Sequence, residues 1–252
     1  MSIYSGNAIP DGWSRRQAIV LVDPNDVDSL SGSDLLFSRE ISVITLPLDP
    51  KNRLAHNIIG SGLDRRGVML MQNPFDPDRY VEMSQAPQKF AVEKYLVLSM
   101  LCGHLGAKKV TIEEVEKRTS SRTQRHKLTT KAPVASGKLE TQQDEIDEVL
   151  RRLEVEHEFS GAQPDFAAAE SLLQRTRLAN DVELYSLIEL CRASNNRVQR
   201  RRMVIDLSDE TKRIFDLVGK IKIPQYLTEI EGGYNRIVRE KAEYSLSVLV
   251  EF

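Results

Sequence analysis

The strongest chemical signal in the chain is a basic segment, KRTSSRTQRHKLTTK, at residues 117 to 131. It holds six lysines and arginines, one histidine and no acid, and Leu128 is its one apolar residue. Cations interspersed with hydroxyls bind phosphate oxygens. The segment is therefore predicted to bind nucleic acid without dependence on base sequence. A second basic run follows at residues 197 to 202. The candidate polyanion contacts are Arg118, Arg122, Arg125, Lys127, Arg197, Arg200, Arg201 and Arg202.

A rival interpretation places the counter-charge of this segment within the same chain. Residues 117 to 139 hold seven lysines and arginines and no acid, whereas residues 140 to 158 hold eight acids against two arginines. A hairpin turning near residue 140 would bring Arg122 opposite Glu158 and His126 opposite Glu154. Such cross-strand pairs contribute roughly 0.2 to 1 kcal/mol each. We favour this interpretation, because the segment has no aromatic residue that could stack on bases.

The sequence does not contain the residue spacings of known metal, nucleotide-binding or catalytic motifs. The four histidines lie far apart, and no Cys/His spacing matches a zinc site, so we expect no metal and no cofactor. The glycines of NIIGSGLDRRG, at residues 57 to 67, match neither the dinucleotide fingerprint nor a phosphate-binding loop. A glycine turn between strands explains them better. We find no catalytic motif in the sequence.

The elements that carry the basic segment admit two interpretations. In the first, a strand starts near Lys108, with Val110 and Ile112 facing the core, and its Thr/Ser-rich remainder runs out into solvent. In the second, Thr111 and Glu114 form a capping box, and a helix over residues 111 to 128 gives a helix-turn-helix. The strand is favoured, since the second helix would have only Leu128 for its core face.

The segments around it predict the architecture from residue 87 onward. QKFAVEKYLVLSMLCGHLG is apolar nearly all round, as in a central buried helix that ends at Gly106. RRLEVEHEFSG, at residues 151 to 161, alternates with a period of two, as a strand does. A helical pair follows at about residues 165 to 193. NRVQRRRMVIDL then predicts a strand on which Arg201, Met203 and Ile205 share a face, and EYSLSVLVEF predicts a C-terminal strand.

Residues 1 to 86 have a different residue pattern, in which short apolar runs alternate with proline- and glycine-rich turns. We expect short strands and loops there, packed as one unit with residues 87 to 252. The net charge of −2 gives no global attraction to polyanions. Cys102 and Cys191 lie in apolar segments, which suits reduced thiols, and the N-terminus does not resemble a signal peptide. These features predict a soluble, cytoplasmic protein.

The sequence therefore predicts an α+β fold, with a mixed or antiparallel sheet, a long β-hairpin (about 108–132 and 150–160), the helical pair (about 165–193) and a C-terminal strand. The expected function is that of a non-enzymatic interaction protein, binding a protein partner or its own copies through the hairpin and the helical pair. One alternative is nucleic-acid binding through the basic strands 117–131 and 197–202. Another is a membrane-perturbing or pore-forming effector held in a soluble form. Direct insertion of the basic segment is not expected, because it lacks alternating apolar residues.

Overall fold

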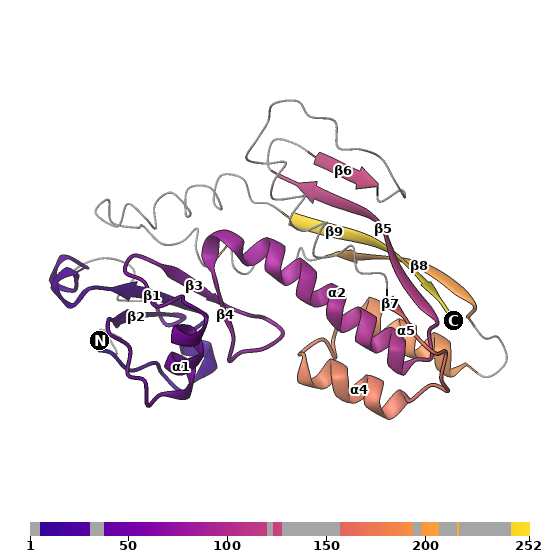
Figure 1. The fold of residues 1–252 in the computed structure, drawn as a ribbon, viewed down its shortest axis with the longest axis horizontal. Coiled ribbons are helices and arrows are strands. Elements are labelled where there is room, and N and C mark those ends of the chain that lie inside the picture. Colours follow the sequence, from indigo (N-terminus) through magenta and orange to yellow (C-terminus); the bar gives the residue numbers. More distant parts are fainter. Residues whose placement is uncertain are drawn as a thin grey trace. The chain divides into compact units, whose positions relative to one another are not determined.

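The computed structural model describes residues 6–30, 38–119, 123–127, 157–193, 198–206, 216 and 243–252. The chain divides into two compact units, the first containing the described residues up to Ala86 and the second beginning at Pro87 and including the C-terminal strand. Each unit is built on one sheet (Figure 1). Helices combined with one mixed and one antiparallel sheet confirm the predicted α+β class.

The first sheet has the strand order β2-β1-β3-β4. Its first pair, β1 and β2, is parallel, and the other two pairs are antiparallel. Every residue of β1 and β2 is buried, which is why β1 is apolar throughout and β2 is apolar except at Ser42 and Thr45. The strands are β1 (Ala18–Val22), β2 (Ile41–Thr45), β3 (Met69–Gln72) and β4 (Tyr80–Glu82), and short 3-10 turns span Trp13–Arg15, Pro24–Asp26, Asp28–Leu30 and Met83–Gln85.

A short helix, α1 (Arg53–Gly60), corrects the expectation that this region holds only strands and loops. The Asn52 side chain caps it by accepting hydrogen bonds from the backbone amides of Leu54 and Ala55, at 2.9 and 3.2 Å. The predicted glycine turn between strands is therefore a turn from a helix into β3, with Gly62 at a φ of +67°. A helix of eight residues beside a glycine run leaves only a weak pattern in the sequence.

The second unit contains an antiparallel sheet with the order β6-β5-β9-β8, to which β7 adds by pairing with β5. The predicted strand at Lys108, the helical pair and the C-terminal strand are all confirmed, and the helical interpretation of the segment after Thr111 is wrong. The elements are α2 (Ala86–His104), β5 (Lys109–Arg118), β6 (Thr123–Lys127), β7 (His157–Glu158), α4 (Phe166–Arg175), α5 (Val182–Arg192), β8 (Arg200–Asp206) and β9 (Glu243–Glu251).

The hairpin pairs as predicted in direction but in a different register. β5 and β7 are antiparallel, yet Glu158 lies opposite Lys109 rather than opposite Arg122. His126 lies opposite Val115, because the basic segment folds back on β5 as the separate strand β6. Arg122 and Glu154 lie outside the described residues. Folding back at this point is favourable, since it places Arg125 of β6 directly opposite an acid of β5, Glu116.

A β-bulge at Glu113 divides β5 into two halves. In the pairing with β9, Ile112 is opposite Val248 but Glu114 is opposite Ser247, so one residue is extra. Val110 and Ile112 are buried before the bulge, and Val115 and Lys117 are buried after it. The expectation that the basic stretch runs out into solvent is therefore wrong for Lys117, whose ammonium lies 5.9 Å from the Tyr244 ring centroid.

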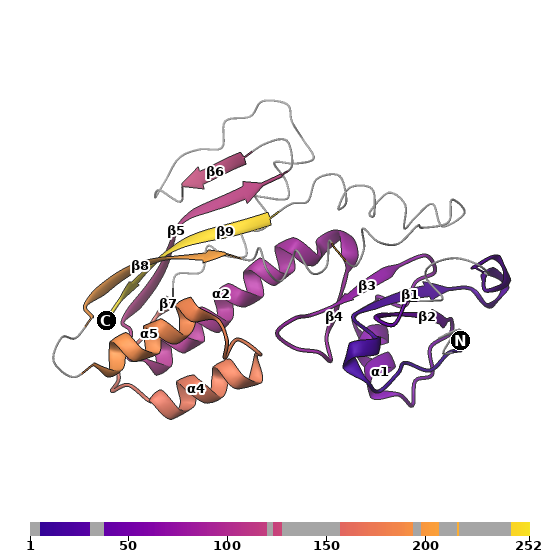
Figure 2. The same ribbon diagram turned by 180° about the vertical axis from the view of Figure 1, so that it is seen from behind.

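Helices α2, α4 and α5 lie on one side of this sheet, as Figures 1 and 2 show from opposite directions. The strands turn a buried row toward them: Val110, Ile112, Val115, Met203, Ile205, Tyr244, Leu246, Val248 and Val250. The helix α2 is buried at Tyr95, Leu98 and Leu101, but Leu96 and Met100 are 40% and 49% exposed, so it is not buried all round as predicted.

Gly106 makes the turn from α2 into β5 through a left-handed conformation, with φ +82°. A Cβ at this position would lie 2.4 Å from the carbonyl oxygen of Ala162, which is far inside van der Waals contact. The segment before α4 also bonds here, because the amide of Asp165 donates to the carbonyl of His104 at 2.7 Å. The turn therefore brings α2 and the start of α4 together, and only glycine fits it.

We expect Gly106→Ala to destabilise the second unit far more than Gly62→Ala destabilises the first. Gly62 has the same sign of φ but open space around its Cα, so it isolates the conformational cost of about 1 kcal/mol. The overlap with Ala162 should bring the cost at Gly106 to about 3 kcal/mol. Urea unfolding followed by circular dichroism measures both, and equal losses would contradict the close approach.

Candidate functional site

Two of the predicted arginines share one acid on the face of the second sheet that points away from the helices, here called the outer face. Arg125 donates from Nε to Glu116 at 2.6 Å, and Arg118 donates to the other oxygen of the same carboxylate. Glu116 is only 8% exposed, whereas both arginine side chains are more than half exposed. The hydrogen bond from Arg118 and then that from Arg125 lower the pKa of Glu116, so this carboxylate stays ionised.

Two more predicted arginines are paired on the same face. Arg202 reaches from β8 across β9 to Glu113, where its Nη2 donates to the carboxylate at 2.8 Å and its Nε to the second oxygen. This bidentate pair lowers the pKa of Glu113. Arg200 lies 3.4 Å from Glu251, its neighbour on β9. The bulge at Glu113 therefore supplies the acid that Arg202 uses.

Arg201 lies on the opposite, helix-facing side with Met203 and Ile205, as the sequence predicted. Its Nη2 donates to the Ser186 hydroxyl of α5 at 3.1 Å, and its Nη1 is buried without a hydrogen-bond partner. The predicted contacts are thus split between two faces of the sheet. Arg122 and Arg197 lie outside the described residues, and only the backbone of Lys127 is described.

The outer face carries no surplus of positive charge among its described side chains. Five bases face seven acids, which leaves a balance of −2. The bases are Lys109, Arg118, Arg125, Arg200 and Arg202, and the acids are Glu113, Glu114, Glu116, Glu158, Asp206, Glu243 and Glu251. The counter-charge thus lies mainly within the sheet itself. Nucleic-acid binding stays a prediction that these described pairs do not favour.

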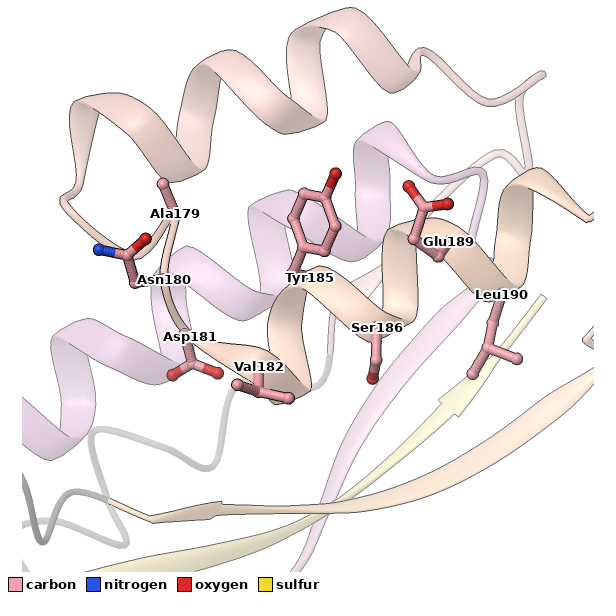
Figure 3. Close-up of a pocket in the computed structure, with 8 residues that line it drawn as sticks. All are labelled: Ala179, Asn180, Asp181, Val182, Tyr185, Ser186, Glu189 and Leu190. Atoms are coloured by element: carbon pink, nitrogen blue, oxygen red, sulfur yellow. The ribbon is translucent and has the colours of Figure 1, made fainter.

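A different surface, on α5, gathers exposed apolar side chains. Val182 is 80% exposed, Tyr185 45% and Leu190 43%. Together with Ala179, Asn180, Asp181, Ser186 and Glu189 they line an open depression of about 630 Å³. Figure 3 shows Val182, Ser186 and Leu190 in one row along the helix, and Tyr185 and Glu189 in the row beside it. We call these residues the α5 face.

The sequence sets this face through the cap and the buried side of α5. Asp181 caps the helix by accepting hydrogen bonds from the amides of Glu183 and Leu184, both at 3.1 Å. Leu184, Leu187 and Ile188 are buried, and these positions lie on the side of the helix opposite the α5 face. The sequence of α5 has apolar residues on two opposite sides of the helix. Periodicity alone did not show which of these sides packs against the rest of the protein and which is exposed.

A buried lysine holds the start of α5 in place. The side chain of Lys94, on α2, is 6% exposed, and its ammonium lies 2.9 Å from the Asp181 carboxylate. It also donates to the backbone carbonyl of Asp206, at the end of β8, at 3.0 Å. The nearby Glu183 has a raised pKa, first because of its partial burial and then because of the negative charge of Asp181.

Within the described part of the chain, no group of three or more histidine, cysteine, aspartate or glutamate side chains is arranged to hold a metal ion. The same residues include no helix with the length and apolar character needed to cross a bilayer. Comparison of the chain with protein-family models, with curated proteins and with solved structures finds no match.

Replacing Glu116 with glutamine should lower the free energy of unfolding at neutral pH by about 1 kcal/mol, because two arginines lose a charged acceptor. The folded pKa of Glu116 is depressed, so this contribution is complete above the unfolded pKa and is lost as pH falls through the folded one. The difference between wild type and variant should therefore shrink in acid. Urea titrations across this range measure it, with the exposed Glu158→Gln as control; a difference independent of pH would refute the ion pairs.

Lys94→Met should cost about 3 kcal/mol, since it leaves the largely buried Asp181 without its cation. Lys89→Met is the matched control, because Lys89 lies on the same helix and makes no ion pair with the described residues. Hydrogen exchange of the α5 amides should accelerate in the first variant alone. Equal protection in both variants would show that Lys94 does not hold α5.

Proposed function

We propose that this protein is an interaction protein that docks a partner protein on the α5 face. The observation that carries the proposal is the exposure of Val182, Tyr185 and Leu190 around one depression. Val182 and Leu190 are eight residues apart and lie in one row along the helix, and Tyr185 lies in the row beside it (Figure 3). Such an exposed apolar face is typical of interfaces that receive an apolar helix or strand. A tyrosine at the edge of the depression adds a large contact area and a polar hydroxyl.

The helical pair supports this role better than the hairpin does. On the outer face of the sheet, the described arginines already have acid partners, so docking there would have to break ion pairs. On the α5 face, docking would cover apolar side chains that now contact water, which is favourable by about 25 cal/mol per Å². The partner role expected from the sequence is thereby assigned to α5.

We also propose that the protein works in the cytoplasm. Cys102 and Cys191 are free thiols in the structure, and a reducing compartment keeps such thiols free. Burial raises the pKa of the Cys102 thiol well above its ordinary value, which keeps it protonated and unreactive.

The double substitution Val182→Ser/Leu190→Ser should weaken partner binding at least tenfold without loss of stability. Both side chains are exposed, so the free energy of unfolding should change by less than about 0.5 kcal/mol. A photo-crosslinking residue in place of Tyr185, in an extract of the source cells, would identify the partner. The purified partner would then be titrated against wild type and variant by isothermal calorimetry.

Val204→Ser is the matched control, because Val204 is 50% exposed but lies on the outer face of the sheet. It should leave the affinity unchanged. A partner that binds the Val182→Ser/Leu190→Ser variant as tightly as wild type would show that the α5 face is not the docking surface.

A further inference from the structure

We infer that the partner segment that binds the α5 face has an apolar ridge flanked by lysine or arginine. These cations would pair with Glu183 and Glu189. A second copy of this chain does not bind there. This inference rests on the proposed function, because it names the chemistry of the partner at the same surface. The inference is supported by the charges around the depression.

The charged residues that line the depression are both acids, Asp181 and Glu189. Lys94 already compensates Asp181 from beneath the helix. Glu189 receives a hydrogen bond from Arg192 at 2.8 Å, but Arg192 also donates to Glu170 of α4 at 2.5 Å. One guanidinium is thus divided between two carboxylates. Arg201, which donates to Ser186 from β8, supplies one further cation on the sheet side of the depression. The side that faces solvent carries the carboxylate of Glu189.

Glu183 adds to this negative surface. It is exposed, stands next to Val182 at the start of α5, and makes no ion pair with any residue that the structure describes. Its pKa is raised first by partial burial and then by the negative charge of Asp181, which together outweigh the opposing charges of Lys94 and Arg201. A further negative charge is therefore unfavourable here, and a cation is favourable. A partner's lysine or arginine next to its apolar ridge would supply that cation.

The amino terminus of α5 does not offer an alternative anion site. The amides of Glu183 and Leu184 already donate to the Asp181 side chain. The positive end of the helix dipole is therefore met by acids of the chain itself. An acidic or phosphorylated partner would face repulsion from Glu183 and Glu189 without gaining free donors.

A second copy is disfavoured by the same charges. In a two-fold contact the same surface meets itself, so every charge occurs twice. From Asp165 to Ala193 the helical pair holds five acids and three arginines, a balance of −2 per copy. An antiparallel contact of α5 with its own copy, centred on Ser186, would place Glu183 opposite Glu189 at both ends. Like charges so placed repel, whereas a basic segment is attracted.

Two synthetic amphipathic helical peptides test the inference. They share one leucine-rich face, flanked in the first by lysine and in the second by glutamate. Fluorescence anisotropy gives the affinities, and amide shift changes in α5 locate the binding. The lysine peptide should bind at least tenfold tighter, and Glu183→Lys/Glu189→Lys should reverse this order. Glu40→Lys/Glu158→Lys changes the net charge equally at exposed sites that are not part of the α5 face, and should retain the wild-type order.

The outcomes separate the two proposals. Equal affinities for the two peptides, both lost in Val182→Ser/Leu190→Ser, would overturn the basic partner and leave the docking face intact. Absence of shift changes in α5 with either peptide would overturn the docking face itself. Sedimentation of a dimer that the same double substitution dissociates would overturn the inference in favour of a second copy.

Discussion

One buried ammonium group holds together the part of the second unit that carries the proposed docking surface. Lys94 is nearly inaccessible to water, and a charge in that position is tolerated only where partners are fixed around it. Its partners are the carboxylate that caps α5 and a backbone carbonyl of β8, so α2, α5 and the sheet meet at one point. Asp181 serves both the lysine and the first turn of α5. The rotation of α5 about its axis follows, and with it the exposure of Val182 and Leu190.

The two faces of the second unit treat polar and apolar groups in opposite ways. On the outer face of the sheet, long arginine side chains lie across neighbouring strands and find acids there, as Arg202 does with Glu113. Such pairs contribute little individually in water, but they specify which strands are neighbours. On α5, exposed apolar groups have no such partners among the described residues. The charged side chains of the outer face are therefore already paired within the sheet. The α5 face is the surface where burial of apolar side chains would favour association.

The sequence allowed those features to be predicted that depend on local periodicity. The alternation in EYSLSVLVEF gave β9 and its buried row, and the position of Arg201 on the side of Met203 was likewise evident. What failed depends on non-local facts. The short helix α1 derives its stability from packing rather than from its own eight residues, and the burial of Lys117 depends on a bulge four residues earlier. The α5 face could not be distinguished from core, because a helical pattern shows which residues lie together but not which of two apolar sides is covered.

The extra residue in β5 decides where that strand can change its length without exchanging its two faces. Side chains alternate strictly along a strand, so the bulge at Glu113 reverses which parity faces the helices: even numbers up to Ile112, odd numbers from Val115. Deleting Glu113 would remove the extra residue and restore unbroken alternation, so Val115 and Lys117 would still face the helices and Glu116 and Arg118 would still face outward. The same deletion would remove the carboxylate that Arg202 binds. Deleting a residue beyond the bulge, such as Glu116, would instead turn Lys117 outward and Arg118 inward. The strand β5 can therefore lose one residue at the bulge without exchanging its faces, but not beyond it.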